Sequence, residues 1–169
     1  GGKLKIGLDM ESDLRRIGIM RDALATSGKT PELCIDVNEY WSPKQAIRYM
    51  HVIEQEYDIT WIEEPARRWD AEGLRKVSDN VRAAVASGEN LHSLEDFVPL
   101  LSARAVDVLN IGAGASGITG AMKLAAVHAL AHLAREPVPA SVSRASTRSG
   151  TCRPPAKPTP TTSACWPRC

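Results

Sequence analysis

Long apolar segments are absent from this sequence of 169 residues, and no apolar stretch with the features of a signal peptide opens it. These absences argue against an integral membrane protein or a secreted one, and we expect a cytoplasmic location. Cysteine is also scarce in the first 134 residues, where Cys34 stands alone inside an apolar run typical of a strand. A disulfide framework is therefore not expected, in keeping with a reducing compartment.

Residues 1–134 also lack an excess of positive charge. They contain fifteen basic and nineteen acidic residues, a balance that offers no basic surface for nucleic acid. Residues 135–169 differ in kind, with six basic residues against one acid, seven of the eleven prolines and three of the four cysteines. We expect residues 139–169 to form an irregular tail, either disordered or encoded by a shifted reading frame, behind a folded domain of residues 1–138.

Three carboxylates are distinctive because each follows an apolar run at a nearly constant interval. Asp36 ends one run, Glu63 ends the next, and Glu89 follows the third, at intervals of 27 and 26 residues. One strand, one helix and two short loops take roughly that many residues, so the spacing predicts successive βα units. The carboxyl ends of parallel strands meet at one edge of a sheet, where ligands bind. Three acids there would repel one another, and a hard divalent cation such as Mg²⁺ resolves that repulsion.

Apolar periodicity predicts that strands and helices alternate along the chain. Helix N-termini are marked by Ser42 with a proline after it, by Asp70, and by Ser93 with Asp96 three residues on. A small-residue turn over residues 112–117 is expected to pack closely around a ligand before the last helix. The expected strands are 1–7, 33–36, 60–63, 81–86 and 106–110, with a weaker sixth run over 136–142, and the expected helices are 11–26, 43–56, 71–77, 94–101 and 118–134.

Five short motifs follow one another in these units: Lys3-Leu4-Lys5, Asp36-Val37-Asn38 with Trp41, Trp61-Ile62-Glu63-Glu64-Pro65, Gly88-Glu89-Asn90 and Ser116-Gly117-Ile118-Thr119-Gly120. In this order and spacing they resemble the mandelate racemase and muconate lactonizing enzyme group of the enolase superfamily, over about residues 1–134. The resemblance implies an α/β fold, a TIM-type (β/α)7β barrel of which this chain supplies about strands 2 to 6, truncated at both ends. The Gly-Glu-Asn form is closer to the mandelate racemase branch, many of whose members dehydrate sugar acids.

The same resemblance implies a role for each residue of the predicted site. Asp36, Glu63 and Glu89 would bind Mg²⁺, which stabilises the enediolate formed when a carboxylate substrate loses its α-proton. Lys5 would be the base that takes this proton. Lys3 would bind the substrate carboxylate, and its like charge would favour the neutral form of Lys5.

Other polar residues near the predicted site have two interpretations. Asn38 and Asn90 follow metal ligands, so they could bind substrate or orient the ligands, or they could simply form turns at strand ends. His92 could contact substrate or lie at the surface. Glu64 follows Glu63 directly and is expected to face away from the site as a supporting residue.

Several charged and imidazole side chains are expected to have structural roles. His128 and His132 have the spacing of a metal-binding pair, but they lie far along an alanine-rich helix and are expected at the surface or in packing. His51 is interpreted in the same way. Arg67 and Arg68 could clamp a substrate hydroxyl or carboxylate, yet a solvated loop charge is the simpler interpretation.

The end of the sixth strand decides between two kinds of reaction. Relatives of the racemase type carry an Asp there and a His after the next strand, whereas this chain has Asn110 at that place and no His after His132. Because β-elimination needs one base and one acid, we expect a Mg²⁺-dependent sugar-acid dehydratase rather than a racemase or epimerase. The expected partner is a small carboxylate, with no nucleic acid or membrane, and the resemblance implies a homo-oligomeric parent. A non-catalytic metal-binding remnant is the remaining alternative, because the capping domain and last strands are absent.

Overall fold

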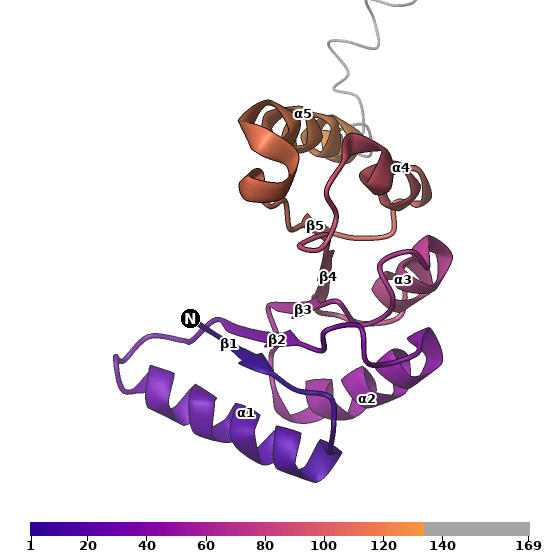
Figure 1. Cartoon of the computed structure of the whole chain (residues 1–169). Coiled ribbons are helices and arrows are strands. Elements are labelled where there is room, and N and C mark those ends of the chain that lie inside the picture. The colour runs from indigo at the N-terminus through magenta and orange to yellow at the C-terminus, as the bar shows by residue number, and fades with distance from the viewer. Residues whose placement is uncertain (134–169) are drawn as a thin grey trace, which may run out of the picture. The chain divides into compact units, whose positions relative to one another are not determined.

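Strands and helices alternate strictly in the computed structural model of the chain, which describes residues 1–133 (Figure 1). The strands are β1 Gly2–Lys5, β2 Leu33–Asp36, β3 Trp61–Glu63, β4 Ala84–Ser87 and β5 Val108–Leu109. The helices are α1 Met10–Ala25, α2 Pro43–Glu56, α3 Ala71–Ser78, α4 Leu94–Ala103 and α5 Ala113–Leu133. Five successive βα units are therefore present, as the spacing of the apolar runs predicted.

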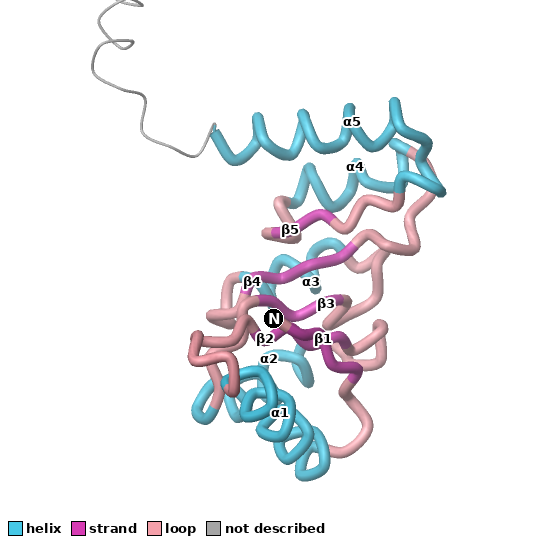
Figure 2. Tube along the Cα trace, turned by 90° about the vertical axis from the view of Figure 1, so that its left-hand side faces the viewer, coloured by secondary structure: helices cyan, strands magenta, loops and turns pink. Residues whose placement is uncertain are grey.

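All five strands join one sheet in chain order, and every neighbouring pair is parallel (Figure 2). Helices α1 to α4 each carry the chain from the carboxyl end of one strand back to the start of the next, which is the connection that parallel strands require. This arrangement confirms the predicted α/β class. It also brings the carboxyl ends of all the strands to a single edge.

The core lies between the sheet and the helices. Ile35, Ile62 and Val85 are paired in register across β2, β3 and β4, and all three are fully buried. Helices α2, α3 and α4 contribute buried apolar residues on the same side: Ala46, Met50, Ile53, Leu74, Val77, Phe97 and Leu100. Because side chains alternate along a strand, the residues on either side of these three point to the opposite face of the sheet.

The predicted helix starts are confirmed by their caps. Ser42 and Asp70 each accept a hydrogen bond from the backbone three residues on. Ser93 and Asp96 form a reciprocal capping box at the start of α4, which satisfies two N–H groups that a helix leaves unpaired.

The segment before the last helix differs from the sequence prediction. Residues 113–116 already form a helical turn, although the helix was expected to begin at 118 after a small-residue turn; the backbone N–H and the hydroxyl of Ser116 both donate to the Gly112 carbonyl. Gly117 then interrupts the helix with φ 70° and ψ 163°, a conformation that glycine adopts without the strain of a Cβ. Strand β5 is also shorter than the predicted 106–110.

Two expectations concern residues beyond the described part. The run 136–142 and the tail 139–169, with the domain boundary before it, lie outside residues 1–133. Within the described part, no helix combines the length and the hydropathy needed to cross a bilayer.

Candidate metal centre

The register of the sheet sets Asp36 beside Glu63. These residues are partners across β2 and β3, and Lys5 on β1 is the partner of Asp36 on the other side. All three are one position beyond the buried apolar row, so their side chains lie on the face opposite the helices. One lysine and two neighbouring acids therefore stand in a row across the carboxyl edge of the sheet.

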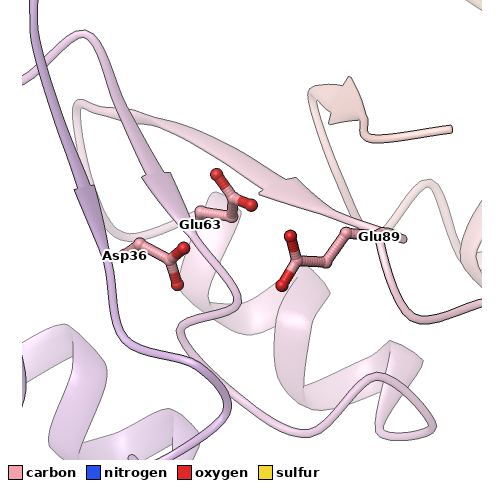
Figure 3. A group of neighbouring side chains, drawn as sticks. All are labelled: Asp36, Glu63 and Glu89. Atoms are coloured by element: carbon pink, nitrogen blue, oxygen red, sulfur yellow. The ribbon is translucent and has the colours of Figure 1, made fainter. Parts of the chain in front are cut away.

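Glu89 reaches this row from the loop after β4. Gly88, between β4 and Glu89, has φ +125°, a conformation that favours glycine and turns the chain there. Figure 3 shows Asp36, Glu63 and Glu89 pointing toward one another, and one carboxylate oxygen from each lies within 4.8 Å of the others. Three residues that are 27 and 26 positions apart in sequence thus converge on one point.

Two lysines supply the counter-charge to these acids. Lys3 Nζ lies 2.5 Å from Glu63 Oε2 and 3.2 Å from Asp36 Oδ2, and Lys5 Nζ lies 2.6 Å from Asp36 Oδ2. Burial alone would lower the pKa of Lys3, but hydrogen bonds and charge attraction from Glu63 and Asp36 outweigh it, so the pKa is raised above its ordinary value. Lys3 is therefore held as an ammonium ion.

The donor set matches a hard divalent cation. Asp36 and Glu63 are 0% and 1% exposed, and their carboxylates are held by the ends of rigid strands, while Glu89 is exposed on its loop. Carboxylate oxygens are the ligands that Mg²⁺ prefers, and oxygens this close can share one ion. Three carboxylates against two ammonium groups also leave an excess of negative charge, which a divalent cation would offset.

Two hollows beside the carboxylates could admit a small molecule. One, of about 410 Å³, is lined by Lys3, Glu63 and Glu89 with Trp61 and residues 109–112. The other, of about 490 Å³, includes Lys5 and Asn38 with parts of α1 and the loops after β1 and β2. Each hollow thus contains one of the two lysines.

The three predicted substrate residues take different places. Asn38 is exposed and lines the same hollow as Lys5. Its side chain hydrogen-bonds Glu64, and its backbone N–H donates to Asp36 Oδ1 at 2.9 Å. The side-chain amide of Asn90 donates to Glu64 at 2.9 Å and to Glu89 at 3.4 Å, which links two acids. His92 is exposed at the start of α4, where its backbone N–H donates to Asp96, and it does not line either hollow.

Glu64 is closer to the ligands than its place in the sequence suggested. It is 1% exposed, and its φ of 45° turns the chain just after β3. Burial and the charges of Glu89 and Glu39 raise the pKa of Glu64, although hydrogen bonds from Asn90 and Asn38 act in the opposite direction. Glu64 is not among the three converging carboxylates, as expected of a supporting residue, but it does not face away from the site, because Asn90 joins it to Glu89.

Arg68 and Glu39 form a contact that the sequence did not predict. Arg68 Nε and Nη2 donate to the two carboxylate oxygens of Glu39 at 2.6 and 2.7 Å, and the Arg68 backbone N–H adds a third bond at 2.8 Å. The interpretation of Arg68 as a solvated loop charge is therefore wrong. No local pattern pointed to this pair, since the two residues lie on different loops.

The histidines outside the site hold helices in place. His51 contacts the Asn80 carbonyl at 2.8 Å, and His128 contacts the Asp107 carbonyl at 3.2 Å. These contacts agree with the packing role expected from the sequence. The Asp107 carboxylate accepts hydrogen bonds from Ser78 and from the Val85 backbone, away from the metal ligands.

Known proteins are similar to this chain in sequence. The family model described as "Enolase C-terminal domain-like" matches residues 1–149. The L-Ala-D/L-Glu epimerase of Clostridium acetobutylicum is 36% identical over 127 residues, which cover 74% of this chain and 35% of that protein. The L-talarate/galactarate dehydratase of Salmonella typhimurium is 34% identical over 133 residues, which cover 76% of this chain and 32% of that protein. The chain thus spans about a third of the length of these relatives.

A solved structure has the same fold. The L-talarate dehydratase from Polaromonas sp. JS666, crystallised with Mg and L-glucarate, superposes with a TM-score of 0.71 and is 32% identical. The match covers 78% of this chain and 36% of that one. Relatives of two reaction types, dehydratases and epimerases, are therefore similar to this chain to almost the same degree.

Proposed function

Because the chain belongs to the enolase C-terminal domain-like family, we propose that it is the Mg²⁺-binding part of an enzyme that removes the α-proton of a carboxylate substrate. The observation that carries this proposal is the convergence of Asp36, Glu63 and Glu89 within 4.8 Å, beside two lysines on the same face of the sheet. A bound Mg²⁺ would polarise the substrate carboxylate, whose α-proton is otherwise too weakly acidic for a side-chain base.

The two lysines have different proposed roles, one in substrate binding and one in proton transfer. Lys3 has a raised pKa, so it stays charged and is suited to attract the substrate carboxylate. Lys5 lies further toward the open carboxyl edge and borders the hollow of about 490 Å³, where its Nζ could receive the α-proton once it is neutral. Asn38 borders the same hollow and could hydrogen-bond a substrate hydroxyl.

Dehydration of a sugar acid is the reaction that we favour. In the described part of the chain, Lys5 is the base at the open edge of the site, and Asn110 stands where a second acid/base residue would be expected on the opposite side. One base suffices for β-elimination, whereas racemisation requires proton transfer on both faces of the substrate. The dehydratases of Salmonella and Polaromonas support this choice.

Epimerisation is the second candidate, and the 36% identity to an L-Ala-D/L-Glu epimerase favours it. The two reactions give different products when they are run in heavy water. Dehydration yields a keto acid, whereas epimerisation returns inverted substrate that carries deuterium at the α-carbon. Deuterium in inverted substrate without keto acid would overturn dehydration in favour of epimerisation.

The experiment that tests the proposal measures turnover of acid sugars and dipeptides with and without Mg²⁺. We expect Mg²⁺-dependent turnover by the chain, its loss in Lys5→Ala, and full retention in Lys29→Ala, which removes an exposed lysine from the loop before β2. Turnover that survives Lys5→Ala would contradict the assigned base. Mg²⁺ binding without turnover would favour a non-catalytic metal-binding role.

A further inference from the structure

The loops after β2, β3 and β4 are joined by hydrogen bonds of Arg68 to Glu39 and to Asn90, none of which involves a carboxylate of the three candidate ligands. Arg68, on the loop after β3, binds both carboxylate oxygens of Glu39, on the loop after β2. The Nη1 of Arg68 also donates to the Asn90 carbonyl, on the loop after β4, at 3.4 Å. One guanidinium therefore touches two neighbouring loops while its own backbone belongs to the third.

The carboxylate of this network is buried, whereas the Arg68 side chain is 30% exposed. Glu39 is 4% exposed and its backbone N–H donates to the Glu64 carbonyl at 2.9 Å, so both ends of the residue are fixed. A planar guanidinium paired with a carboxylate through two parallel bonds is directional as well as strong. Such a pair can define the distance between two loops, which a single flexible contact could not.

Backbone strain is concentrated at the same place. Asn38, Glu39 and Glu64 have φ of 47°, 62° and 45°, three of the four non-glycine residues with positive φ in the described part of the chain. A non-glycine residue in this conformation is strained and persists only when surrounding contacts fix it. The hydrogen bonds of Glu39, Arg68 and Asn90 are the contacts that surround these residues.

We propose that Arg68 is a positioning residue for the metal centre: through Glu39 and Asn90 it holds the loops after β2, β3 and β4 at the spacing that lets Asp36, Glu63 and Glu89 share one cation. Glu89 depends on it most, because its side chain is exposed and the adjacent Asn90 is the residue that Arg68 contacts. The inference rests on the proposed function only for the identity of the cation.

Two explanations of the role of Arg68, by its charge or by its positioning of loops, predict opposite changes in Mg²⁺ affinity when Arg68 is replaced. The guanidinium is a positive charge near three carboxylates, so by charge alone its removal should strengthen the binding of Mg²⁺. If Arg68 acts by position, its removal should weaken the binding, because the carboxylates must then be ordered when the ion arrives. The sign of the change therefore separates the two explanations.

The test is Mg²⁺ titration calorimetry on the full chain. We expect binding about tenfold weaker in Arg68→Gln, as for other residues that orient metal ligands. Arg68→Lys keeps the charge without the two-pronged contact, and it should also bind more weakly. The matched control is Arg67→Gln, which removes the same charge from the exposed neighbouring residue and should bind as tightly as the wild type or slightly more so.

Two further measurements separate a loss of Mg²⁺ affinity from a loss of folding. Thermal unfolding shows whether each variant is folded. If Arg68→Gln does not fold, Arg68→Lys provides the measurement of Mg²⁺ affinity. Amide hydrogen exchange without Mg²⁺ should be faster for residues 88–91 in the Arg68 variants and unchanged in Arg67→Gln. Equal or tighter Mg²⁺ binding by folded Arg68 variants would overturn the inference and leave the proposed function standing. No Mg²⁺ binding by the wild-type chain would overturn the proposed function itself.

Discussion

Lys3 and Lys5 occupy equivalent positions on one strand, yet they have different partners. Strand alternation in the sequence was enough to predict that both point to the same face. It could not predict that Lys3 would bridge Glu63 and Asp36 while Lys5 contacts Asp36 alone, since these pairings depend on the register between three strands. These different partners match the two proposed roles, with Lys3 as the carboxylate binder and Lys5 as the base.

The Glu39–Arg68 pair makes a prediction about pH. Hydrogen bonds and the charge of Arg68 lower the pKa of Glu39, against the opposing effect of burial. A carboxyl group with a lowered folded pKa adds stability above its unfolded pKa of about 4.3, and this stability is lost as pH falls through the folded value. Glu39→Gln should therefore lower the free energy of unfolding by about 2 kcal/mol at pH 7, the typical value for a charged hydrogen bond.

Urea unfolding of the wild type and Glu39→Gln at a series of pH values checks this prediction. The difference between the two proteins should begin to shrink as pH falls below the unfolded pKa of about 4.3, and it should disappear once pH is below the lowered pKa of folded Glu39. A difference that stays constant down to the lowest pH at which both proteins fold would show that Glu39 contributes by packing and not by its charge.

At the scale of elements, periodicity and capping located the helices well. Helices α1 to α4 begin within one residue of the predicted positions, because Ser42, Asp70 and Ser93 satisfy backbone groups that lie within three residues of them. Strand β5 and the start of α5 were less predictable. A run of glycine and alanine carries little periodicity, so the helical turn at 113–116 depends on hydrogen bonds to Gly112 that a pattern does not reveal.

The loop between β4 and α4 depends on a glycine. Gly88 has φ +125°, and a Cβ at this position would lie 2.8 Å from Phe97 Cε1 and 2.9 Å from the Asn110 carbonyl oxygen. Gly88→Ala should therefore lower the free energy of unfolding by about 2 kcal/mol, through strain and through displacement of Phe97. Denaturant unfolding measures this loss.

Gly114→Ala is the matched control for this substitution. A Cβ at Gly114 would meet no atom within 4 Å, and the residue lies in the first turn of α5. This variant should be as stable as the wild type or more stable by up to about 1 kcal/mol. Equal effects of the two substitutions would contradict the account of the β4–α4 loop.

At the scale of the whole molecule, one face of the sheet packs against the helices and the other carries the candidate metal ligands. Ile35, Ile62 and Val85 anchor one face to the helices. Asp36 and Glu63 lie on the other face at the ends of β2 and β3, and Glu89 joins them from the loop after β4. The sequence intervals of 27 and 26 residues already implied that the three acids come from successive βα units, but not that Glu89 would lie beyond Ala86, the register partner of Glu63. The Glu39–Arg68–Asn90 network could not be predicted, since it joins three loops that periodicity does not describe.

The metal centre is the central claim, and it can be tested without any substrate. Glu63→Gln replaces one carboxylate oxygen donor by an amide of the same size at the end of β3, outside the apolar core. Lys3 would keep Asp36 as a partner at 3.2 Å, so we expect the fold to be retained. The control is Glu56→Gln, an exposed residue that ends α2 at the opposite edge of the sheet.

Isothermal titration calorimetry with Mg²⁺ is the most direct measurement on these three proteins. We predict that Glu63→Gln weakens the binding at least about tenfold, since a direct ligand should matter no less than the residues that orient it. Glu56→Gln should bind as tightly as the wild type. Unchanged Mg²⁺ affinity in folded Glu63→Gln would contradict the assignment of Asp36, Glu63 and Glu89 as a metal centre, and with it the chemistry proposed for Lys5.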